Sequence, residues 1–481
     1  MSKFNQSNKV LNATYEGGKA YEKDVANDWL NFIFTSFLQN TYYESSEKQQ
    51  ARFVALTNAM MEKYGAEFVA KAAVLSRQVF GLRSIGCLTA AFLNNQKFDN
   101  KRKFYKDFCN RPDDTGEIFA AIKNVFGQKR SHACVRGVGD YISTLSEYQM
   151  GKYKMASKEF NLMDIINITH ANSPVIDSYK RGALSSPDTW ENFISNSASK
   201  EERDAEWIRL VEEGKLGYLA LIRNLRNILN CEGVSNEWVE SNLVPQICNE
   251  EKIKKSKVFP YQIFSAYKYC ESSNPALTLA LSNAFMLSCG NVEPFEGNTC
   301  VILDVSGSME SSISGQSSMR LVDVGACYAA MLYLTQDCDF IKFGNNAIKQ
   351  DYKKTDNVFD IIAQMTKNDN CGFGTYIQAA FCLLEKHYDR IIIVSDMQVM
   401  SSIGWNITQS QIAYETFSKY TQTFGDCHVF SYDISNYPIS IFPPEDNRLH
   451  FCSALNNISF AMIPYLEGGK NLVDFVNSYE L

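Results

Sequence analysis

An apolar run that ends in a carboxylate constrains this chain more than any other feature. Residues 301–303, Val-Ile-Leu, lead directly into Asp304, and the hydroxyls of Ser306 and Ser308 follow at two-residue spacing. Such a run is typical of a buried parallel strand, and open α/β sheets bind ligands at the carboxyl ends of their strands. One carboxylate and two alcohols on a short loop are hard oxygen donors, so the pattern predicts a site for a divalent cation, Mg2+ first of all.

The D-x-S-x-S-M motif resembles the metal-ion-dependent adhesion site of von Willebrand factor A domains. The resemblance implies that a threonine and an aspartate from later loops complete the ligand shell, often through water, and that one position stays open for a partner. Thr375, ahead of a helical pattern, and Asp396, at the end of a second apolar run, occupy the matching places. The implied metal ligands are Asp304, Ser306, Ser308, Thr375 and Asp396. Serines that follow a strand are also common as plain helix caps, which is the alternative to a metal site. The motif alone also does not distinguish a site with a bound ion from one that only keeps this shape.

The composition is that of a soluble globular protein, with 45% hydrophobic and 21% charged residues in a chain of 481. The fourteen cysteines are scattered through apolar stretches without a C-x-x-C pair, which indicates buried free thiols in a reducing compartment. The first residues do not resemble a signal peptide, and no apolar run reaches the roughly 18 to 20 residues of a membrane helix. We therefore expect a cytoplasmic protein without a membrane partner.

Charge is distributed unevenly along the chain. Residues 1–300 hold 36 Lys and Arg against 34 Asp and Glu, whereas residues 301–481 hold 11 against 20. The change coincides with the strand of the metal motif. It predicts two units with different partners, residues 1–294 and 295–481, of which the first is the better candidate to bind a polyanion.

Helical periodicity dominates residues 29–294, as in the spacing of Phe53, Leu56, Met60 and Tyr64, and no strong strand pattern occurs there. The segment before residue 29 is polar and reads as an extended lead-in. Gly, Pro, Asn and Asp separate the helical patterns at intervals of a few tens of residues. Paired helices with short turns are typical of HEAT-like repeats, which stack into extended or closed concave surfaces. A compact, non-repetitive helical bundle is the alternative.

Strand and helix patterns alternate from about residue 297. We expect strands near 301–304, 340–344, 348–352, 390–396, 428–434 and 449–454, the second and third as a hairpin, with helices between the others. Alternation of this kind predicts a mainly parallel, Rossmann-like sheet covered on both faces. Right-handed crossovers would bring Asp304, Thr375 and Asp396 to one rim. The expected fold is thus a helical-repeat ring followed by an α/β domain of the von Willebrand factor A type.

Four segments of the first unit resemble TROVE proteins, the telomerase, Ro and vault group. Residues 219–225, L-A-L-I-R-N-L, are similar to T-A-L-L-R-N-L, and residues 259–263, F-P-Y-Q-I, are similar to H-P-F-H-I. Residues 135–141 and 164–170 match two further signatures loosely. The resemblance implies binding of small structured, Y-like non-coding RNA outside the ring and of single-stranded ends of misfolded RNA within it. It also implies an exoribonuclease as a possible partner.

Such binding requires a basic surface, because neutralised phosphates supply most sequence-independent affinity. Between residues 97 and 136 there are ten Lys and Arg against five Asp and Glu. The candidate RNA-binding residues are Lys101, Arg102, Lys103, Lys129, Arg130, His132, Arg136, Lys152, Lys154 and His170. A charged run can equally be a solvated helix face. Arg223, flanked by apolar residues, is expected to pair within the helix stack rather than to contact RNA.

The predicted metal site at the rim of the sheet does not indicate an enzyme. Residues 307–309, Gly-Ser-Met, lack the G-K-[ST] ending of a phosphate loop, and the motif loops contain no histidine that could serve as a general base. We expect a monomeric binding protein whose open metal position takes an acidic side chain or a phosphate. The alternative is a metal-dependent protein-interaction scaffold without specific RNA binding, since the charge of the first unit is nearly balanced.

Overall fold

The computed structural model describes most of the chain. The described residues are 12–14, 18–36, 44–153, 158–184, 199–270, 274–290, 294–313, 318–354, 356–399, 409–435, 437, 439–452, 460 and 462–481. None of the helices within these ranges combines the length and the apolar character that a membrane crossing would require.

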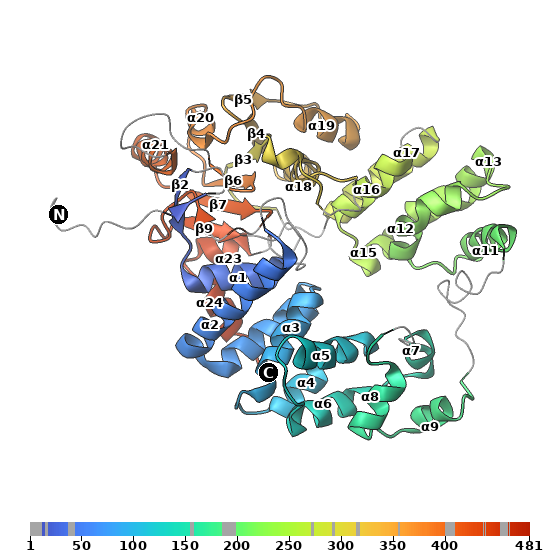
Figure 1. The fold of residues 1–481 in the computed structure, drawn as a ribbon. Helices are drawn as coiled ribbons and strands as arrows, with labels where there is room; N and C mark the ends of the chain where they lie inside the picture. Colours follow the sequence, from blue (N-terminus) through green and yellow to red (C-terminus); the bar gives the residue numbers. More distant parts are fainter. Residues whose placement is uncertain are drawn as a thin grey trace.

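Helices follow a ring-shaped path that leaves the sheet and returns to it (Figure 1). The first arm contains α1 (Val25–Thr35), α2 (Ser46–Val74), the π-helix η1 (Leu75–Val79), α3 (Ser84–Phe92), the 3-10 helix η2 (Leu93–Asn95), α4 (Lys101–Phe108), α5 (Pro112–Asn124), α6 (His132–Ile142), α7 (Glu147–Lys152), α8 (Leu162–Thr169) and α9 (Pro174–Lys180). The second arm contains α11 (Lys200–Glu212), α12 (Tyr218–Leu229), α13 (Asn236–Trp238), the π-helix η3 (Val239–Leu243), α14 (Val244–Ile247), α15 (Glu250–Ser256), α16 (Pro260–Cys270) and α17 (Pro275–Cys289).

Local sequence signals explain where these helices begin and break. α8 starts with a capping box, in which the Asp164 amide donates to Asn161 Oδ1 and the Asn161 amide donates to Asp164 Oδ2, both at 2.9 Å. Proline occupies the first turn of α5, α9 and α17, where its missing N–H costs no helix hydrogen bond. Gly65 interrupts α2 with a φ of 82°, a conformation that strains residues other than glycine.

A six-stranded sheet forms the α/β part, in the order β5-β4-β3-β6-β7-β9. Its strands are β3 (Thr299–Asp304), β4 (Cys338–Phe343), β5 (Ala347–Gln350), β6 (Arg390–Ser395), β7 (His428–Asp433) and β9 (Leu449–Cys452). All neighbours are parallel except the β4–β5 hairpin. The strand order reverses at β3, and a reversal of this kind is where doubly wound sheets bind their ligands.

Alternate residues of the strands point to opposite faces of this sheet. Ile302 and Ile393 pack with α20 (Ile377–Phe381) and α21 (Gln409–Phe424), whereas Leu303 and Val394 pack with α18 (Leu321–Thr335) and α19 (Val358–Met365). The second helical arm shares the core of the latter face. The expected helical ring followed by an α/β domain is therefore confirmed.

The first described residues pack on the α/β part, and the last described residues pack on the first helical arm. β1 (Asn12–Ala13) and β2 (Lys19–Glu22) form a small sheet with β8 (Ile439–Ser440). The C-terminal helix α24 (Leu472–Asn477), which follows α23 (Ile463–Glu467), packs its Val476 into the core of the first arm. In its described residues the polar lead-in is extended up to Asp24, as expected, although α1 already begins at Val25. It also forms strands that its sequence does not indicate, because β2 pairs with β8, more than 400 residues further along the chain.

Candidate metal centre and basic surface

The metal motif lies at the carboxyl ends of two adjacent parallel strands. Leu303 of β3 pairs with Val394 of β6, so that Asp304 meets Ser395 at the edge of the sheet. The Ser395 hydroxyl donates to Asp304 Oδ2 at 2.5 Å, and the Ser306 amide donates to Asp304 Oδ1 at 2.8 Å. The sheet therefore brings the first carboxylate of the motif beside the strand that ends in the second.

The motif loop curls back over this edge. The hydroxyls of Ser306 and Ser308 lie 3.5 Å apart, and burial raises the pKa of Asp396 while the hydrogen bond between Ser308 and this carboxyl opposes the rise. Asp304, Ser306 and Asp396 are all buried. Four of the five implied ligands thus form one cluster.

The loop that contains Thr375 lies against the motif loop. The Gly307 amide donates to the Phe373 carbonyl at 2.9 Å, and Thr375 is buried. A Cβ atom on Gly344 would lie 2.2 Å from the Gly372 carbonyl oxygen, so only glycine allows the loop to pack this closely on the end of β4. Asn368 holds the same loop from its other side by donating to the carbonyl of Gly372 at 2.9 Å.

The two carboxylates repel each other in a buried setting. Burial raises the pKa of Asp304 to about 6, against the effect of its hydrogen bonds from Ser395 and Ser306. Burial, and then the charge of Asp304, raise the pKa of Asp396 to about 8. Asp396 Oδ2 is buried and has no hydrogen-bond partner among the described residues. A bare carboxylate oxygen beside a second carboxylate and two hydroxyls fits a hard cation, whose charge would favour both ionised forms.

Hydroxyl oxygens are essential to this fit. In the described part of the chain, no cluster of three or more His, Cys, Asp or Glu side chains is arranged to hold a metal ion. The motif has two carboxylates, so the remaining ligands would have to be serine and threonine oxygens or water.

Two residues that the sequence did not reveal support this edge. Asp433 ends β7 in register with Ser395 of β6, and Lys23 reaches it from the end of β2. The Lys23 ammonium lies 2.9 Å from Asp433 Oδ2 and donates to the Tyr437 carbonyl at 2.7 Å. The apolar run before Asp433 was a usable signal for a third carboxylate at the rim, but no local pattern marks Lys23.

A cluster of three cations surrounds Asp140, where α4 packs on α6. A Cβ atom on Gly137 would lie 2.3 Å from the Arg102 carbonyl oxygen, so this glycine lets the two helices approach. Arg102 donates to both carboxylate oxygens of Asp140, at 2.6 and 2.8 Å. The pKa of Asp140 is lowered first by this hydrogen bonding, and the charges of Lys106 and Arg136 add to the effect. We call Arg102, Lys106, Arg136 and Asp140 the Asp140 cluster.

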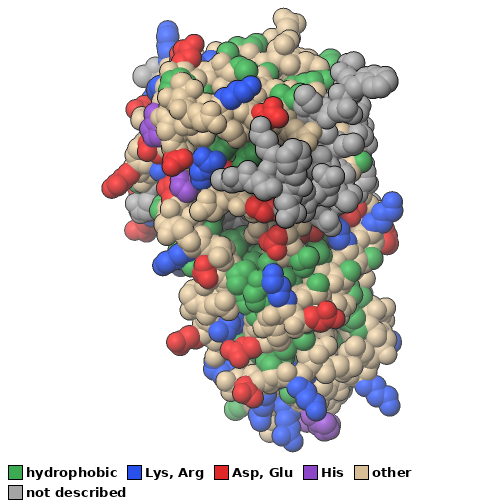
Figure 2. Space-filling model, turned by 90° about the vertical axis from the view of Figure 1, so that its left-hand side faces the viewer, with side chains coloured by type: hydrophobic (Ala, Val, Ile, Leu, Met, Phe, Trp, Pro, Cys, Tyr) green, Lys and Arg blue, Asp and Glu red, His purple; other side chains and the backbone are tan. Residues whose placement is uncertain are grey.

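Two cations of the Asp140 cluster are available to a ligand. Lys106 and Arg136 are exposed, and their side chains make no hydrogen bond or ion pair within the described ranges. Lys106 lies in the basic stretch between residues 97 and 136 but was not among the candidate residues. Figure 2 shows Lys and Arg side chains gathered with a His at the lower end of the molecule, where Figure 1 places α4, α6 and α8. The cluster therefore carries an excess of positive charge on an open surface.

Besides Arg102, three candidate residues between residues 97 and 136 are engaged by other groups of the protein. Lys101 donates to the carbonyls of Asn94 and Gln96 at 2.6 and 2.7 Å, and burial lowers its pKa. Lys103 pairs with Asp107 at 3.2 Å. The Arg130 guanidinium lies 5.0 and 5.3 Å from the ring centroids of Phe119 and Phe160. Partners of this kind reduce the availability of these cations for phosphate.

Lys129, His132 and His170 lie around the start of α6 and the end of α8, and Lys152 ends α7. Lys129 and His132 are exposed, and His170 is exposed at the end of α8 with a φ of 53°. The Lys152 ammonium is 5.8 Å from the rings of both Tyr148 and Tyr153. Lys154 lies outside the described residues.

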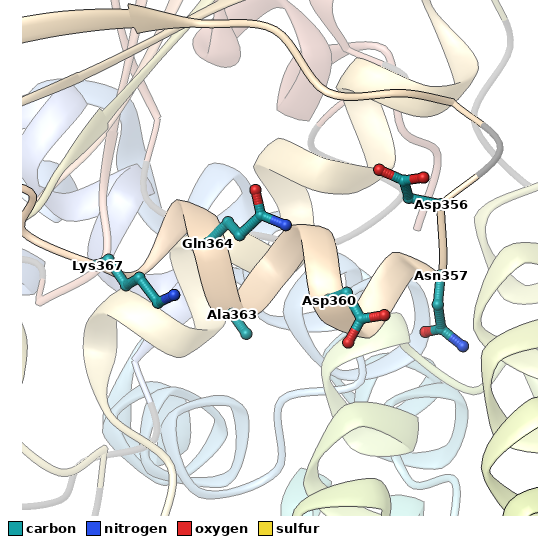
Figure 3. Close-up of a pocket in the computed structure, with 6 residues that line it drawn as sticks. All are labelled: Asp356, Asn357, Asp360, Ala363, Gln364 and Lys367. Carbon is teal, nitrogen blue, oxygen red and sulfur yellow. The ribbon is translucent and has the colours of Figure 1, made fainter.

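A separate cavity of about 350 Å3 runs along α19 (Figure 3). It is lined by Asp356, Asn357, Asp360, Ala363, Gln364 and Lys367. The buried Lys342 fixes the end of this helix by donating to the carbonyls of Gln364 and Lys367 at 3.1 and 2.8 Å. The lining is polar, and it offers neither the hydroxyl cluster nor the aromatic faces that would select a ligand.

Comparison with known proteins finds a match to one domain-family model within the chain and a solved structure with a similar fold. Residues 168–296 match the family model of the TROVE domain, and this segment contains the two signatures at 219–225 and 259–263. Telomerase protein component 1 of Rattus norvegicus is 29% identical over 108 residues, which are 22% of this chain and 4% of that protein. The Mus musculus protein is 31% identical over 88 residues, 18% of this chain and 3% of its own. This chain therefore spans only a small part of the length of these relatives.

A solved structure matches nearly the whole chain. The crystal structure of the Ro (RSR) protein of Deinococcus radiodurans superimposes with a TM-score of 0.62 at 15% sequence identity. The match covers 92% of this chain and 100% of the Deinococcus chain. At this identity the similarity establishes a shared fold.

Proposed function

We propose that this chain, which carries a TROVE domain and has the fold of a Ro protein, binds RNA beside a divalent-metal site. The observation that carries the proposal is the Asp140 cluster, in which three cations surround one carboxylate on an exposed surface. The ligands that the Ro resemblance implies are small structured, Y-like non-coding RNA on this surface and single-stranded ends of misfolded RNA in the ring.

Phosphate chemistry supports this surface as the contact with a structured RNA. Arg136 and Lys106 approach Asp140 from different helices, so their spacing is fixed by the α4–α6 packing rather than by one flexible segment. His170 lies close to α6. Thr169, the residue before His170, has a Cβ atom only 3.1 Å from where a Cβ atom on Gly139 of α6 would lie. A fixed group of cations loses little conformational freedom when it binds phosphates.

The metal site is the second part of the proposal. The hydroxyls of Ser306, Ser308 and Thr375 and the carboxylates of Asp304 and Asp396 would hold Mg2+, directly or through water. The bare, buried Oδ2 of Asp396 beside the Asp304 carboxylate supports this assignment. The bound ion would supply a Lewis-acid position that takes an acidic side chain of a partner, or a phosphate. An exoribonuclease is one partner that the Ro resemblance supports.

Binding of a structured RNA hairpin at several salt concentrations tests the RNA part. The variant Lys106→Gln/Arg136→Gln should weaken binding, and the slope of log K against log salt should fall by about 1 for each phosphate that is no longer neutralised. The matched control is Lys254→Gln/Lys255→Gln, which removes two exposed cations from α15. Fluorescence anisotropy with the labelled hairpin gives both quantities.

Two results would contradict the RNA role. One is equal and weak binding of the hairpin and of a polyphosphate control at moderate salt. The other is an equal effect of the α4–α6 variant and the α15 variant, which would show that only net charge matters.

A further inference from the structure

A cavity of about 210 Å3 lies where α12, α16 and the segment after the metal motif meet. It is lined by Leu219, Ile222, Arg223, Tyr261, Gln262, Ser265, Ala266, Tyr269, Ile313 and Met319. We propose that this cavity binds one unpaired nucleotide of a single-stranded RNA, with Arg223 on a phosphate and the tyrosine rings on the base. The inference rests on the proposed RNA-binding function and assigns a specific subsite to it.

Arg223 makes the cavity selective for an anion. Its side chain is exposed, and it forms no ion pair or hydrogen bond within the described part of the chain, contrary to the pairing in the helix stack that its apolar neighbours indicate. Among the described residues that line the cavity, none is Asp or Glu. A guanidinium without a counter-charge presents a planar fork of donors that matches two phosphate oxygens.

Two tyrosines of α16 line the cavity, and Tyr269, whose ring is the more exposed, supplies a face on which a base would stack. Tyr261 is held by Phe259, whose ring is 5.9 Å away at an interplanar angle of 12°. Tyr269 is 46% exposed, and the Arg226 guanidinium lies 5.5 Å from its ring centroid. Unpaired bases bind by stacking on aromatic rings and guanidinium planes of this kind, largely without regard to sequence.

The relative positions of cation and ring fit a nucleotide better than a carboxylate. Burial raises the pKa of Tyr261, and the charge of Arg223 opposes the rise, which places the guanidinium near this phenol. Gln262 and Ser265 add polar groups of the type that contact base edges and ribose hydroxyls. An acidic peptide would use Arg223 but would leave the aromatic and amide groups without a role.

The cavity is also connected to the metal motif through a short segment. Ile313, in the lining, donates its amide to the carbonyl of Met319 at 2.9 Å, and the Leu321 amide donates to the Ser311 carbonyl at 2.9 Å. The Ser311 hydroxyl donates to the carbonyl of Ser308, a motif residue, at 2.6 Å. RNA in the cavity would therefore lie on the segment that leads from the metal site.

Binding of a fluorescein-labelled ten-nucleotide oligo(U) to the full chain, followed by anisotropy, tests the subsite. Arg223→Gln should weaken this binding about tenfold, the loss expected for one charge-assisted contact. Arg203→Gln removes an exposed arginine from α11 in the same arm and should leave the affinity unchanged. Arg223→Gln should also leave the affinity for the structured hairpin unchanged, because the Asp140 cluster is in the other arm.

Tyr269→Leu provides a second variant with little risk to folding, since the ring is half exposed, and it should weaken oligo(U) binding several-fold. Equal oligo(U) affinities of Arg223→Gln, Arg203→Gln and the unaltered chain would overturn the subsite while the hairpin result still supports the proposed function. If Arg223→Gln instead loses binding to a ten-residue polyglutamate and keeps its affinity for oligo(U), the cavity is a peptide site. This result would also overturn the nucleotide subsite. Failure of the unaltered chain to bind either RNA would overturn both proposals.

Discussion

Lys23 and Asp433 form a buried ion pair that ties the residue after β2 to the rim of the sheet. The ammonium and carboxylate are 2.9 Å apart, and both side chains are 2% exposed. Thr14 reinforces the connection, because its hydroxyl donates to the carbonyl of Val399 at 2.7 Å, just after Asp396. The polar lead-in thus supports the loops that leave β6 and β7 beside the metal motif.

Removing one partner of this pair should destabilise the folded protein. Lys23→Met leaves the Asp433 carboxylate buried without its counter-charge, and we expect the free energy of unfolding to fall by about 3–5 kcal/mol. The freed loops should also weaken the stabilisation that Mg2+ gives. Thermal unfolding with and without Mg2+ measures both effects.

Lys103→Met is the control for this change, because the Lys103–Asp107 pair has side chains 56% and 46% exposed. Exposed pairs contribute little to stability. Equal unfolding temperatures for the two variants would show that the Lys23–Asp433 pair does not support the rim.

Local patterns were sufficient to predict the α/β part. The strands that end at Asp304 and just before Asp396 are apolar on both faces, so periodicity and chain order predicted two parallel strands with both carboxylates at one rim, and the structure shows that these strands are neighbours. The same reasoning found the β4–β5 hairpin. Asp304 and Asp396 could be placed at the edge of the sheet because Asp304 ends its strand and Asp396 directly follows the end of β6, whereas Thr375 was placed by its position ahead of a helical pattern.

Features that depend on distant neighbours could not be predicted. The pairing of β2 with β8 and the docking of α24 on the first arm depend on partners at the other end of the sequence. The partners of a charged side chain could not be predicted either, for the same reason. The sequence shows that Lys101 and Arg223 are cations, but only tertiary contacts show that the first is held by backbone carbonyls and the second is free in a cavity.

The stability of the metal-free protein should fall between pH 6.5 and 8.5. Burial, together with mutual repulsion at Asp396, raises the pKa values of Asp304 and Asp396 to about 6 and 8, above that of an unfolded chain. The folded state therefore binds more protons than the unfolded state, so unfolding becomes easier as these protons are released. Burial lowers the pKa of His450 to about 4, so this residue gives the opposite slope mainly below about pH 6.5, where the unfolded imidazole binds its proton.

Thermal unfolding in a chelator across this pH range measures the effect. Asp396→Asn has no proton to release and should show a flatter dependence, and Mg2+ should stabilise the unaltered chain more at pH 8.5 than at pH 6.5. An unaltered chain with the same pH dependence as Asp396→Asn would contradict the buried carboxylate pair.

The metal site and the Asp140 cluster should act independently. Asp304→Ala removes a buried carboxylate from the rim, so we expect the Mg2+-dependent shift in unfolding temperature and any metal-dependent capture of an acidic partner to disappear. RNA hairpin affinity should stay within about twofold, since sites without shared partners behave additively. Loss of hairpin binding in a folded Asp304→Ala protein would favour RNA contact at the rim instead.

The contact between α4 and α6 should determine both stability and hairpin binding. In Gly137→Ala the new Cβ would meet the Arg102 carbonyl oxygen at 2.3 Å and Cβ of Tyr105 at 2.7 Å, neither of which can rotate away. The helices must separate, at a cost of about 1–3 kcal/mol in unfolding free energy. Separation also moves Lys106 away from Arg136, so hairpin affinity should fall although every cation is retained.

Gly86→Ala separates this geometric effect from a general effect of alanine. Gly86 is also a buried helical glycine of the first arm, in α3, but its added Cβ would meet the ring of Phe108 at 3.4 Å, an ordinary contact. Its stability should therefore change by less than about 1 kcal/mol, because alanine also restricts the unfolded chain. If Gly137→Ala is folded and binds the hairpin as well as Gly86→Ala does, the spacing of the two helices does not organise the basic surface, and exposed charge alone accounts for the affinity.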